Sequence, residues 1–382
     1  MKKIFNAIII LAITLLGVVL ISEYKKPEPV EEVVVIEKPE EDRIETITMV
    51  SIGDIMYHST QILENTSRPS GYDFVDSMAL TKPYFKNADI TIGNYETTTT
   101  KTKAYTGYPQ FNTPVESLDA IKDAGFDILS TINNHTLDSG KQGLIDTYNA
   151  IQTRGMIPIG TRPTPQPSLR SIERKGIKLG FLAYTYGFNG LDFYLTEEQH
   201  QYMVSSIDEE KIESEIKSSV AANNDLTVVM MHWGNEYQTK PSDTQRDLAH
   251  KMVDWGADVI LGSHPHVVQE HEMINDAFVI YSMGNYVSDQ RLETLGDINT
   301  ERGLLIEFTF EKNFTSNITK IKEIDYHPLW VNKYYKEDRY FYEAIPAKDF
   351  LDGKIDPYVP DGSRARIQAA YDETLKRVQG LD

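Results

Sequence analysis

The chain has 382 residues, 25% of them charged, and a formal net charge of −19 at pH 7. This acidity argues against binding to nucleic acid through a general basic surface, so no nucleic-acid partner is expected. The chain has no cysteine, which excludes disulfides, zinc–thiolate sites and a cysteine nucleophile. Any metal ion must therefore be held by His, Asp, Glu or Asn.

The first 46 residues are predicted to anchor and tether the protein. Residues 4–21 are almost wholly apolar behind two lysines, and a helix of this length spans about 27 Å, close to the hydrocarbon core of a bilayer. No small-residue cleavage site follows, so residues 1–22 are interpreted as an uncleaved single-pass signal anchor, with a cleaved signal peptide as the alternative. Residues 23–46 are rich in Glu, Lys and Pro and are predicted to form an acidic tether. The rest of the chain is expected outside a bacterial cell membrane.

Beyond the tether, apolar segments alternate with helical patterns. Strands are predicted at residues 47–52, 90–92, 126–130, 180–184, 226–231, 259–261 and 278–282, and helices at 115–124, 143–154, 242–255 and 363–378. This alternation indicates an α/β fold, which we assign to residues 47–330. Residues 331–382 contain many aromatics and are predicted to be a C-terminal extension that packs on this domain.

Side chains able to bind metal recur just past the predicted strands. Ligands of open α/β sheets bind at the carboxyl ends of the strands. Any single Asp or Asn at such a place can instead be a helix cap or a turn residue. We interpret the recurrence at six strand ends as a binding site formed by Asp54, Glu96, Asn134, His135, His232, His264, His266 and Asn285.

The segment Gly262-Ser263-His264-Pro265-His266 is the strongest single signal. Residues two apart on a strand lie on one face, the proline stiffens the pair, and neutral imidazole is the commonest metal ligand. A surface loop that happens to hold two histidines is the alternative.

The whole set is suited to two divalent ions, with Mn, Fe or Zn the expected metals. Two ions can clamp the attacking and leaving oxygens of a phosphoester displacement. Glu96 can bridge the ions with its two oxygens, and Asn134 offers an amide oxygen. His135 can donate a proton to the leaving group and Asp138 can orient it, although these two can also be an ordinary capping pair.

Six motifs resemble the CapA family of poly-γ-glutamate capsule proteins, whose domain is similar to the calcineurin-like metallophosphatases. They run in family order between residues 47 and 290. They are Gly53-Asp54-Ile55-Met56, Gly93-Asn94-Tyr95-Glu96, Asn133-Asn134-His135-Thr136-Leu137-Asp138-Ser139-Gly140, His232-Trp233-Gly234-Asn235-Glu236-Tyr237, Gly262-Ser263-His264-Pro265-His266-Val267 and Ser282-Met283-Gly284-Asn285-Tyr286.

The resemblance implies a metallophosphatase-like four-layer α/β/β/α sandwich. It implies that Asp54 and His266 serve one ion, that Asn134, His232 and His264 serve the other, and that Glu96 lies between them. The chain departs from the metallophosphatase pattern at two places. Asp-x-His is missing at Asp54, and the bridging position holds Glu96 where those enzymes have Asp.

The remaining candidates are expected to contact substrate, each with a structural alternative. His58 can be a displaced ligand, a substrate contact or a helix-start residue. Glu236 can take a proton or a cationic substrate group, or cap the following helix. Core packing is the alternative for two aromatic residues, and a strand end for Asn285. The full set is His58, Asn94, Trp233, Glu236, Tyr237 and Asn285.

The resemblance favours a membrane-anchored protein of poly-γ-glutamate capsule synthesis or export with a metal-dependent hydrolase-type site. Its expected partners are poly-γ-glutamate or another anionic cell-surface polymer, membrane synthase subunits, and the membrane through the N-terminal helix. Two other classes stay open: a non-enzymatic polyanion-binding subunit, and a secreted phosphodiesterase unrelated to capsule.

Overall fold

The computed structural model describes residues 42–66 and 71–381. The predicted anchor and all of the tether up to residue 41 lie outside the described residues. Within the described ranges, no helix combines the length and apolar character needed to cross a bilayer. The chain from Arg43 onward forms one compact unit.

The first sheet has eight strands in the order β14-β13-β12-β1-β2-β3-β4, with β11 paired to β1. Strands β1 to β4 are parallel, whereas β12, β13 and β14 join them as antiparallel neighbours. The strands are β1 (Ile44–Ile55), β2 (Ile90–Tyr95), β3 (Ile128–Ser130), β4 (Ile157–Ile159), β11 (Asn285–Val287), β12 (Arg302–Asn313), β13 (Ile318–Lys336) and β14 (Arg339–Pro346).

The second sheet has six strands in the order β5-β6-β7-β8-β10-β9. Its four central strands are parallel, and an antiparallel strand closes each edge. The strands are β5 (Arg170–Arg174), β6 (Ile177–Thr185), β7 (Leu226–His232), β8 (Val259–Ser263), β9 (His271–Ile274) and β10 (Ala277–Ile280).

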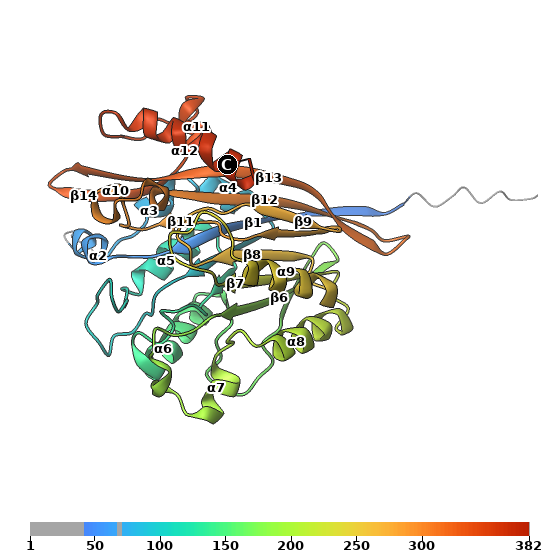
Figure 1. Ribbon diagram of the computed structural model, residues 1–382. Helices are drawn as coiled ribbons and strands as arrows, with labels where there is room; N and C mark the ends of the chain where they lie inside the picture. Colours follow the sequence, from blue (N-terminus) through green and yellow to red (C-terminus); the bar gives the residue numbers. More distant parts are fainter. Residues whose placement is uncertain (1–41, 67–70, 382) are drawn as a thin grey trace, which may run out of the picture. The chain divides into compact units, whose positions relative to one another are not determined.

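Helices cover the outer faces of both sheets. Figure 1 shows α8 and α9 beside β6 and β7, and α11 and α12 beside β13. The helices are α2 (Ser59–Asn65), α3 (Asp76–Ala79), α4 (Lys82–Asn87), α5 (Glu116–Ala124), α6 (Gly140–Thr153), α7 (Glu197–Met203), α8 (Glu209–Ala221), α9 (Asp243–Trp255), α10 (Leu292–Leu295), α11 (Ala347–Leu351) and α12 (Ser363–Val378).

Alternating side chains place the main core between the two sheets. In β1, Ile47 and Met49 point into the core between the sheets, whereas Val50 faces the helices on the outer side. In β8, Leu261 points into the same central core and Ile260 faces α8 and α9. This two-residue period, buried on both faces, is the pattern of sheets covered on both sides. The predicted four-layer α/β/β/α sandwich is confirmed.

The predicted boundaries need three corrections. Strand β13 runs through the expected division at residue 330, so residues 331–346 complete the first sheet and only the segment with α11 and α12 lies against it. Strand β1 begins at Ile44, inside the predicted tether. Asn285 does not end the strand predicted at residues 278–282, because that strand ends at Ile280 and Asn285 begins β11 in the other sheet.

Candidate metal centre

The predicted ligands converge between the ends of the two sheets. On the first sheet, Asp54 is the last residue but one of β1, and Glu96 follows β2. On the second sheet, His232 ends β7, and His264 and His266 follow β8. Each of these side chains is at most 3% exposed. The oxygen donors thus come from the first sheet and the nitrogen donors from the second. Asn134, which follows β3, adds a third oxygen donor on the first-sheet side.

The carboxylates lie within contact distance of the imidazoles. His266 Nδ1 is 3.1 Å from Asp54 Oδ2, and His266 Nε2 is 3.8 Å from Glu96 Oε1. His232 Nε2 is 3.4 Å from the same Glu96 oxygen and 2.9 Å from Asn134 Oδ1. Two groups, each with ligand atoms within 4.8 Å of one another, share Glu96: one with His232 and His264, the other with Asp54 and His266. Glu96 thus belongs to both groups that could hold an ion, and its bridging role stays a prediction.

Burial sets the charge state of this cluster. Burial, reinforced by the neighbouring Asp54 carboxylate, raises the pKa of Glu96 well above its usual value. Burial also lowers the pKa of His232 well below its usual value and that of His264 to about 3. The imidazoles are therefore neutral at neutral pH, which is the form that binds metals.

Two atoms of the cluster that could bind a metal ion have no hydrogen-bond partner among the described residues. They are Glu96 Oε1 and His264 Nδ1. Buried polar atoms are rarely left in this condition, and an ion is one recognised explanation. The two carboxylates also share the cluster with no Lys or Arg ion pair in the described ranges. Oxygen and nitrogen donors that converge with no cationic side chain among the described residues fit a divalent cation.

The backbone after β8 differs from the predicted strand geometry. Strand β8 ends at Ser263, and both histidines have positive φ, 95° for His264 and 57° for His266. Their imidazoles are therefore brought to the site by a turn and not by a shared strand face. Non-glycine residues in such conformations are strained, and strain of this kind concentrates at functional sites.

Two predicted substrate contacts turn out to hold the ligands in place. Asn94 Nδ2 donates to Asp54 Oδ1 at 2.8 Å and to Glu96 Oε2 at 3.2 Å. Asn285 Oδ1 lies 3.1 Å from His266 Nδ1. Both asparagines are buried, so they orient ligands as partners of metal-binding side chains commonly do. Neither asparagine lines a cavity beside the centre, and direct contact with substrate stays a prediction for both.

The predicted substrate contact of Trp233 is wrong, because this residue packs in the core. Its side chain is buried in the cluster on the outer face of the second sheet, and its Nε1 donates to the carbonyl of Tyr281 at 3.0 Å. It lines neither cavity beside the metal centre. The alternative interpretation, core packing, describes its place.

His135 and Asp138 form the predicted pair. His135 Nδ1 is 2.7 Å from Asp138 Oδ2, which also accepts a hydrogen bond from the backbone N–H of Phe111 at 2.6 Å. The Phe111 ring lies edge-on to His135, with ring centres 4.7 Å apart, and edge-on to His58, at 5.1 Å. The contact with Asp138 leaves Nε2 as the nitrogen that His135 can present to a ligand.

Two cavities adjoin the centre. One of about 440 Å³ is lined by His58, Glu236, Tyr237, His266 and others, and one of about 310 Å³ is lined by Asn134, Asp138 and Asn189 among others. They share Tyr108, His135 and Glu236. The predicted contacts His58, Glu236 and Tyr237 are thus placed where a ligand can reach them. Glu236 does not cap the following helix, because Ser242 is the N-cap of α9.

Tyr186 was missed by the sequence argument. Its ring centre is 4.5 Å from that of His264 and 6.3 Å from that of His232, and the side chain is 48% exposed. It follows β6, so the rule that found the ligands at strand ends would have found it had aromatic residues been considered. Tyr108 lies in an irregular loop and no sequence pattern marks it.

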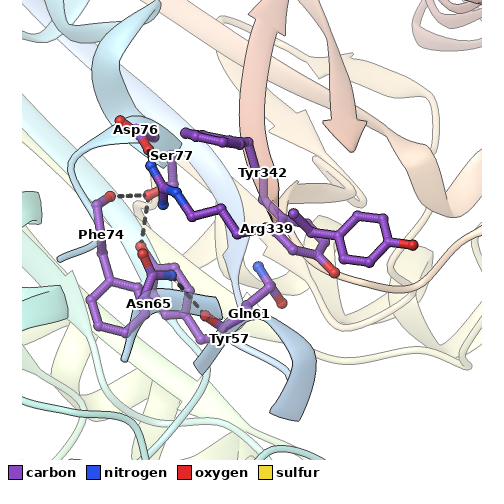
Figure 2. Close-up of a pocket in the computed structure, with 10 residues that line it drawn as sticks. Tyr57, Gln61, Asn65, Phe74, Asp76, Ser77, Arg339 and Tyr342 are labelled. Atoms are coloured by element: carbon purple, nitrogen blue, oxygen red, sulfur yellow. Dashed lines mark hydrogen bonds and ion pairs between the residues drawn. The ribbon is translucent and has the colours of Figure 1, made fainter. Parts of the chain in front are cut away.

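A further pocket lies apart from the metal centre, between the segment of β1–α3 and strand β14. Figure 2 shows Arg339 extending toward Asp76 beside Tyr57, Gln61 and Tyr342. Arg339 Nη2 is 3.5 Å from Asp76 Oδ2. The cavity is only about 20 Å³, which is room for a single water, so it is not a substrate site.

The sequence is similar to known capsule proteins. A family model described as bacterial capsule synthesis protein PGA_cap matches residues 48–290. The chain is 30% identical to the PGA biosynthesis protein CapA of Bacillus subtilis over 72% of its own length and 70% of the relative. It is 31% identical to the capsule biosynthesis protein CapA of Bacillus anthracis, over 71% of this chain and 66% of the relative.

Solved structures with a related arrangement include the calcineurin-like phosphoesterase YfkN of Bacillus subtilis. Its TM-score is 0.47 at 13% identity, with 87% of this chain and 99% of that chain covered. A phosphatase from Mycoplasma pneumoniae gives 0.46 at 14% identity, over 82% and 98%. The family model and the two CapA relatives decide the assignment: the chain belongs to the PGA_cap family of bacterial capsule synthesis proteins.

Proposed function

We propose that this protein is an extracytoplasmic component of poly-γ-glutamate capsule synthesis or export, anchored in the cell membrane by its N-terminal segment and carrying a metal-dependent hydrolase-type site. Membership of the capsule family supports the pathway. The convergence of two carboxylates and three imidazoles, with Glu96 Oε1 and His264 Nδ1 lacking a hydrogen-bond partner among the described residues, is the observation that carries the proposed chemistry.

Asp54, Glu96, Asn134, His232, His264 and His266 would hold the ions. Bound divalent metal would polarise a carbonyl or phosphoryl oxygen and lower the pKa of a water ligand. The remaining chemistry belongs to the chain itself. Asp138 holds the Nδ1 proton of His135, which leaves Nε2 to pass a proton to a leaving group in the cavity.

The test is metal content and hydrolysis measured on the same samples of the full chain in detergent. We expect about two equivalents of Mn, Fe or Zn, and cleavage of phosphoester or γ-glutamyl compounds. The His264→Ala variant should lose metal and activity. His250→Ala is the matched control, because His250 is exposed on α9 and pairs only with Glu272 among the described residues.

Circular dichroism of both variants separates loss of metal from loss of fold. A folded wild-type protein that takes up no metal at millimolar ion would contradict the proposal. So would full complementation of a deletion strain by Glu96→Ala and His135→Ala proteins, because a non-enzymatic subunit needs neither group.

A further inference from the structure

Glu236 is a carboxylate shared by the two cavities. It is exposed, it lines both the 440 Å³ and the 310 Å³ cavity, and it forms no ion pair with a Lys or Arg of the described residues. A ligand atom of Glu236 lies within 4.8 Å of His264 and His266. A group bound at Glu236 would therefore sit directly beside a group held at the metal centre.

Three tyrosines lie at or near the cavities that Glu236 lines. The phenol of Tyr237 hydrogen-bonds to Glu236, and Tyr108 lines both cavities with 74% of its surface exposed. The Tyr186 ring lies beside His264, with ring centres 4.5 Å apart, and its phenol is close enough to Glu236 for the carboxylate charge to act on it. A carboxylate with aromatic rings nearby is suited to an ammonium group.

The cavities offer no positive side chain to an anion. None of the described residues that line them is a lysine or an arginine. Asp289, the other carboxylate of the larger cavity, is already neutralised by Lys333, whose Nζ is 2.7 Å away. Lys103 lines neither cavity; its Nζ is 3.4 Å from the carbonyl oxygen of Asp138 and lies over the Tyr194 ring.

His58 supplies a hydrogen bond to the larger cavity without supplying charge. Its Nδ1 accepts the backbone N–H of Asp289 at 3.2 Å, so the ring proton is on Nε2. Burial lowers the pKa of His58 to about 4, and the neighbouring Asp289 does not restore it. The imidazole is therefore a neutral donor suited to a carbonyl oxygen.

We infer that Glu236 and its three tyrosines select ligands that carry an ammonium group next to the group held at the metal centre. The inference rests on the proposed function, because it names the end of the substrate that enters that same site. In a γ-linked glutamate chain only the amino-terminal unit has a free ammonium group. Every unit carries a free α-carboxylate, but an interior unit has no ammonium group that could pair with Glu236. The site therefore takes the amino end of a chain, or a short amine-bearing compound, and not the interior of the polyanion.

The test compares ligand pairs that differ in the ammonium group. One pair is γ-glutamyl-glutamate and its N-acetyl derivative, and the other is phosphoethanolamine and monoethyl phosphate. Binding to the full chain in Mn²⁺ is measured by calorimetry, with metal content and hydrolysis recorded on the same samples. We expect the amine of at least one pair to bind roughly five- to tenfold tighter than its partner, with a preference that shrinks as salt is raised. The pair that shows it identifies the amine as a glutamyl or a phosphate-linked one.

Glu236→Gln should abolish the preference and leave the metal content unchanged, because it removes the charge and keeps the size of an exposed side chain. Glu210→Gln, which removes an exposed carboxylate from α8, should keep the preference. Equal binding within both pairs, a preference that survives in Glu236→Gln, or no binding of any probe would overturn the inference. Loss of metal from Glu236→Gln would also overturn it, since Glu236 would then be a ligand.

Failure of the proposed function looks different. A metal-loaded protein that prefers the amines but hydrolyses none of the tested compounds would keep the inference and remove the hydrolase. A protein that hydrolyses both members of a pair with equal efficiency would keep the hydrolase and remove the inference.

Discussion

Two buried charged clusters of this protein obey opposite rules. Around Arg291 and Glu301 every charge is answered: Arg291 Nη2 is 3.0 Å from Glu301 Oε2, Leu292 N–H donates to the other carboxylate oxygen, and Arg291 Nη1 donates to the carbonyl of Val331. At the metal centre, Asp54 and Glu96 lie together with no Lys or Arg beside them, and Glu96 Oε1 has no hydrogen-bond partner among the described residues. The side chains of the first cluster satisfy one another, whereas those of the second leave partners that a bound metal ion could supply.

The largest effect is expected when the Arg291–Glu301 ion pair is broken. Glu301→Ala leaves the buried Arg291 guanidinium with only the exposed Glu293, 3.7 Å from its Nε, as a counter-charge, so we expect the free energy of unfolding to fall by about 3 kcal/mol. Urea denaturation measures this. The double variant Arg291→Met with Glu301→Leu should recover most of the loss, because it removes both charges. A single variant as stable as the wild type would show that this pair holds nothing together.

The metal centre should behave in the opposite way. Glu96→Gln removes one of two adjacent carboxylates, so the metal-free variant should be at least as stable as the metal-free wild type. Mn²⁺ at a hundredfold excess over its Kd should stabilise the wild type by about 3 kcal/mol and the variant far less. Thermal unfolding with and without a chelator checks this, with Glu210→Gln as the control that keeps the full response. Equal stabilisation of both proteins would remove Glu96 from the ligand set.

Asp138 is intermediate between the two clusters, because only one of its oxygens is hydrogen-bonded. Oδ2 contacts Phe111 N–H and His135 Nδ1, and Oδ1 has no hydrogen-bond partner in the described ranges. Asp138→Asn no longer holds the Nδ1 proton of His135, and kcat should fall about 100-fold with KM and metal content little changed. Steady-state kinetics on the substrate found for the wild type measures it. An unchanged kcat would leave His135 without a catalytic role.

Asp258 is a buried carboxylate with a smaller expected effect. It has a backbone hydrogen-bond donor and no ion pair among the described residues. Thr227 N–H donates to its carboxylate at 2.7 Å, yet burial raises the pKa of Asp258 to about 6. The folded state therefore holds this proton more tightly than the unfolded state, so the stabilising contribution is complete below about pH 4 and is lost as the pH rises through 6. Asp258→Asn should gain about 1–2 kcal/mol over the wild type above that window, with the exposed Asp254→Asn as control. A pH-independent difference would contradict the assignment.

The layered core and most metal ligands could be predicted from the sequence because both follow from short-range periodicity. Apolar runs such as residues 226–231 announce strands, and a polar residue after each run marks the sheet edge. The exchange of sheets between β10 and β11 has no such local signal. It depends on Gly284, whose carbonyl accepts the N–H of Asp54 at 3.0 Å and brings Asn285 to His266.

The roles of the polar side chains were harder to predict than their positions. Asn94 and Trp233 stand in motifs with ligands, but register turns Asn94 toward Asp54 and sends Trp233 to the opposite face of its sheet. The long antiparallel extension through β12, β13 and β14 was divided wrongly because aromatic residues alone do not show which strand they pair with. Tyr186 follows a strand end and was missed because only metal-binding residue types were considered there, whereas Tyr108 reaches the cavities through a loop conformation that no periodicity encodes.

The division of donors between the sheets has a mechanical consequence. All oxygen donors come from the layer of β1, β2 and β3, and all nitrogen donors from the layer of β7 and β8. An ion bound by side chains of both sheets would link the two sheets at that edge more firmly than the polar contacts already there, such as that of His232 Nε2 with Asn134 Oδ1. Amide hydrogen exchange should then slow together at the ends of β1 and β8 when metal is added, although the two segments are separated by about two hundred residues of chain.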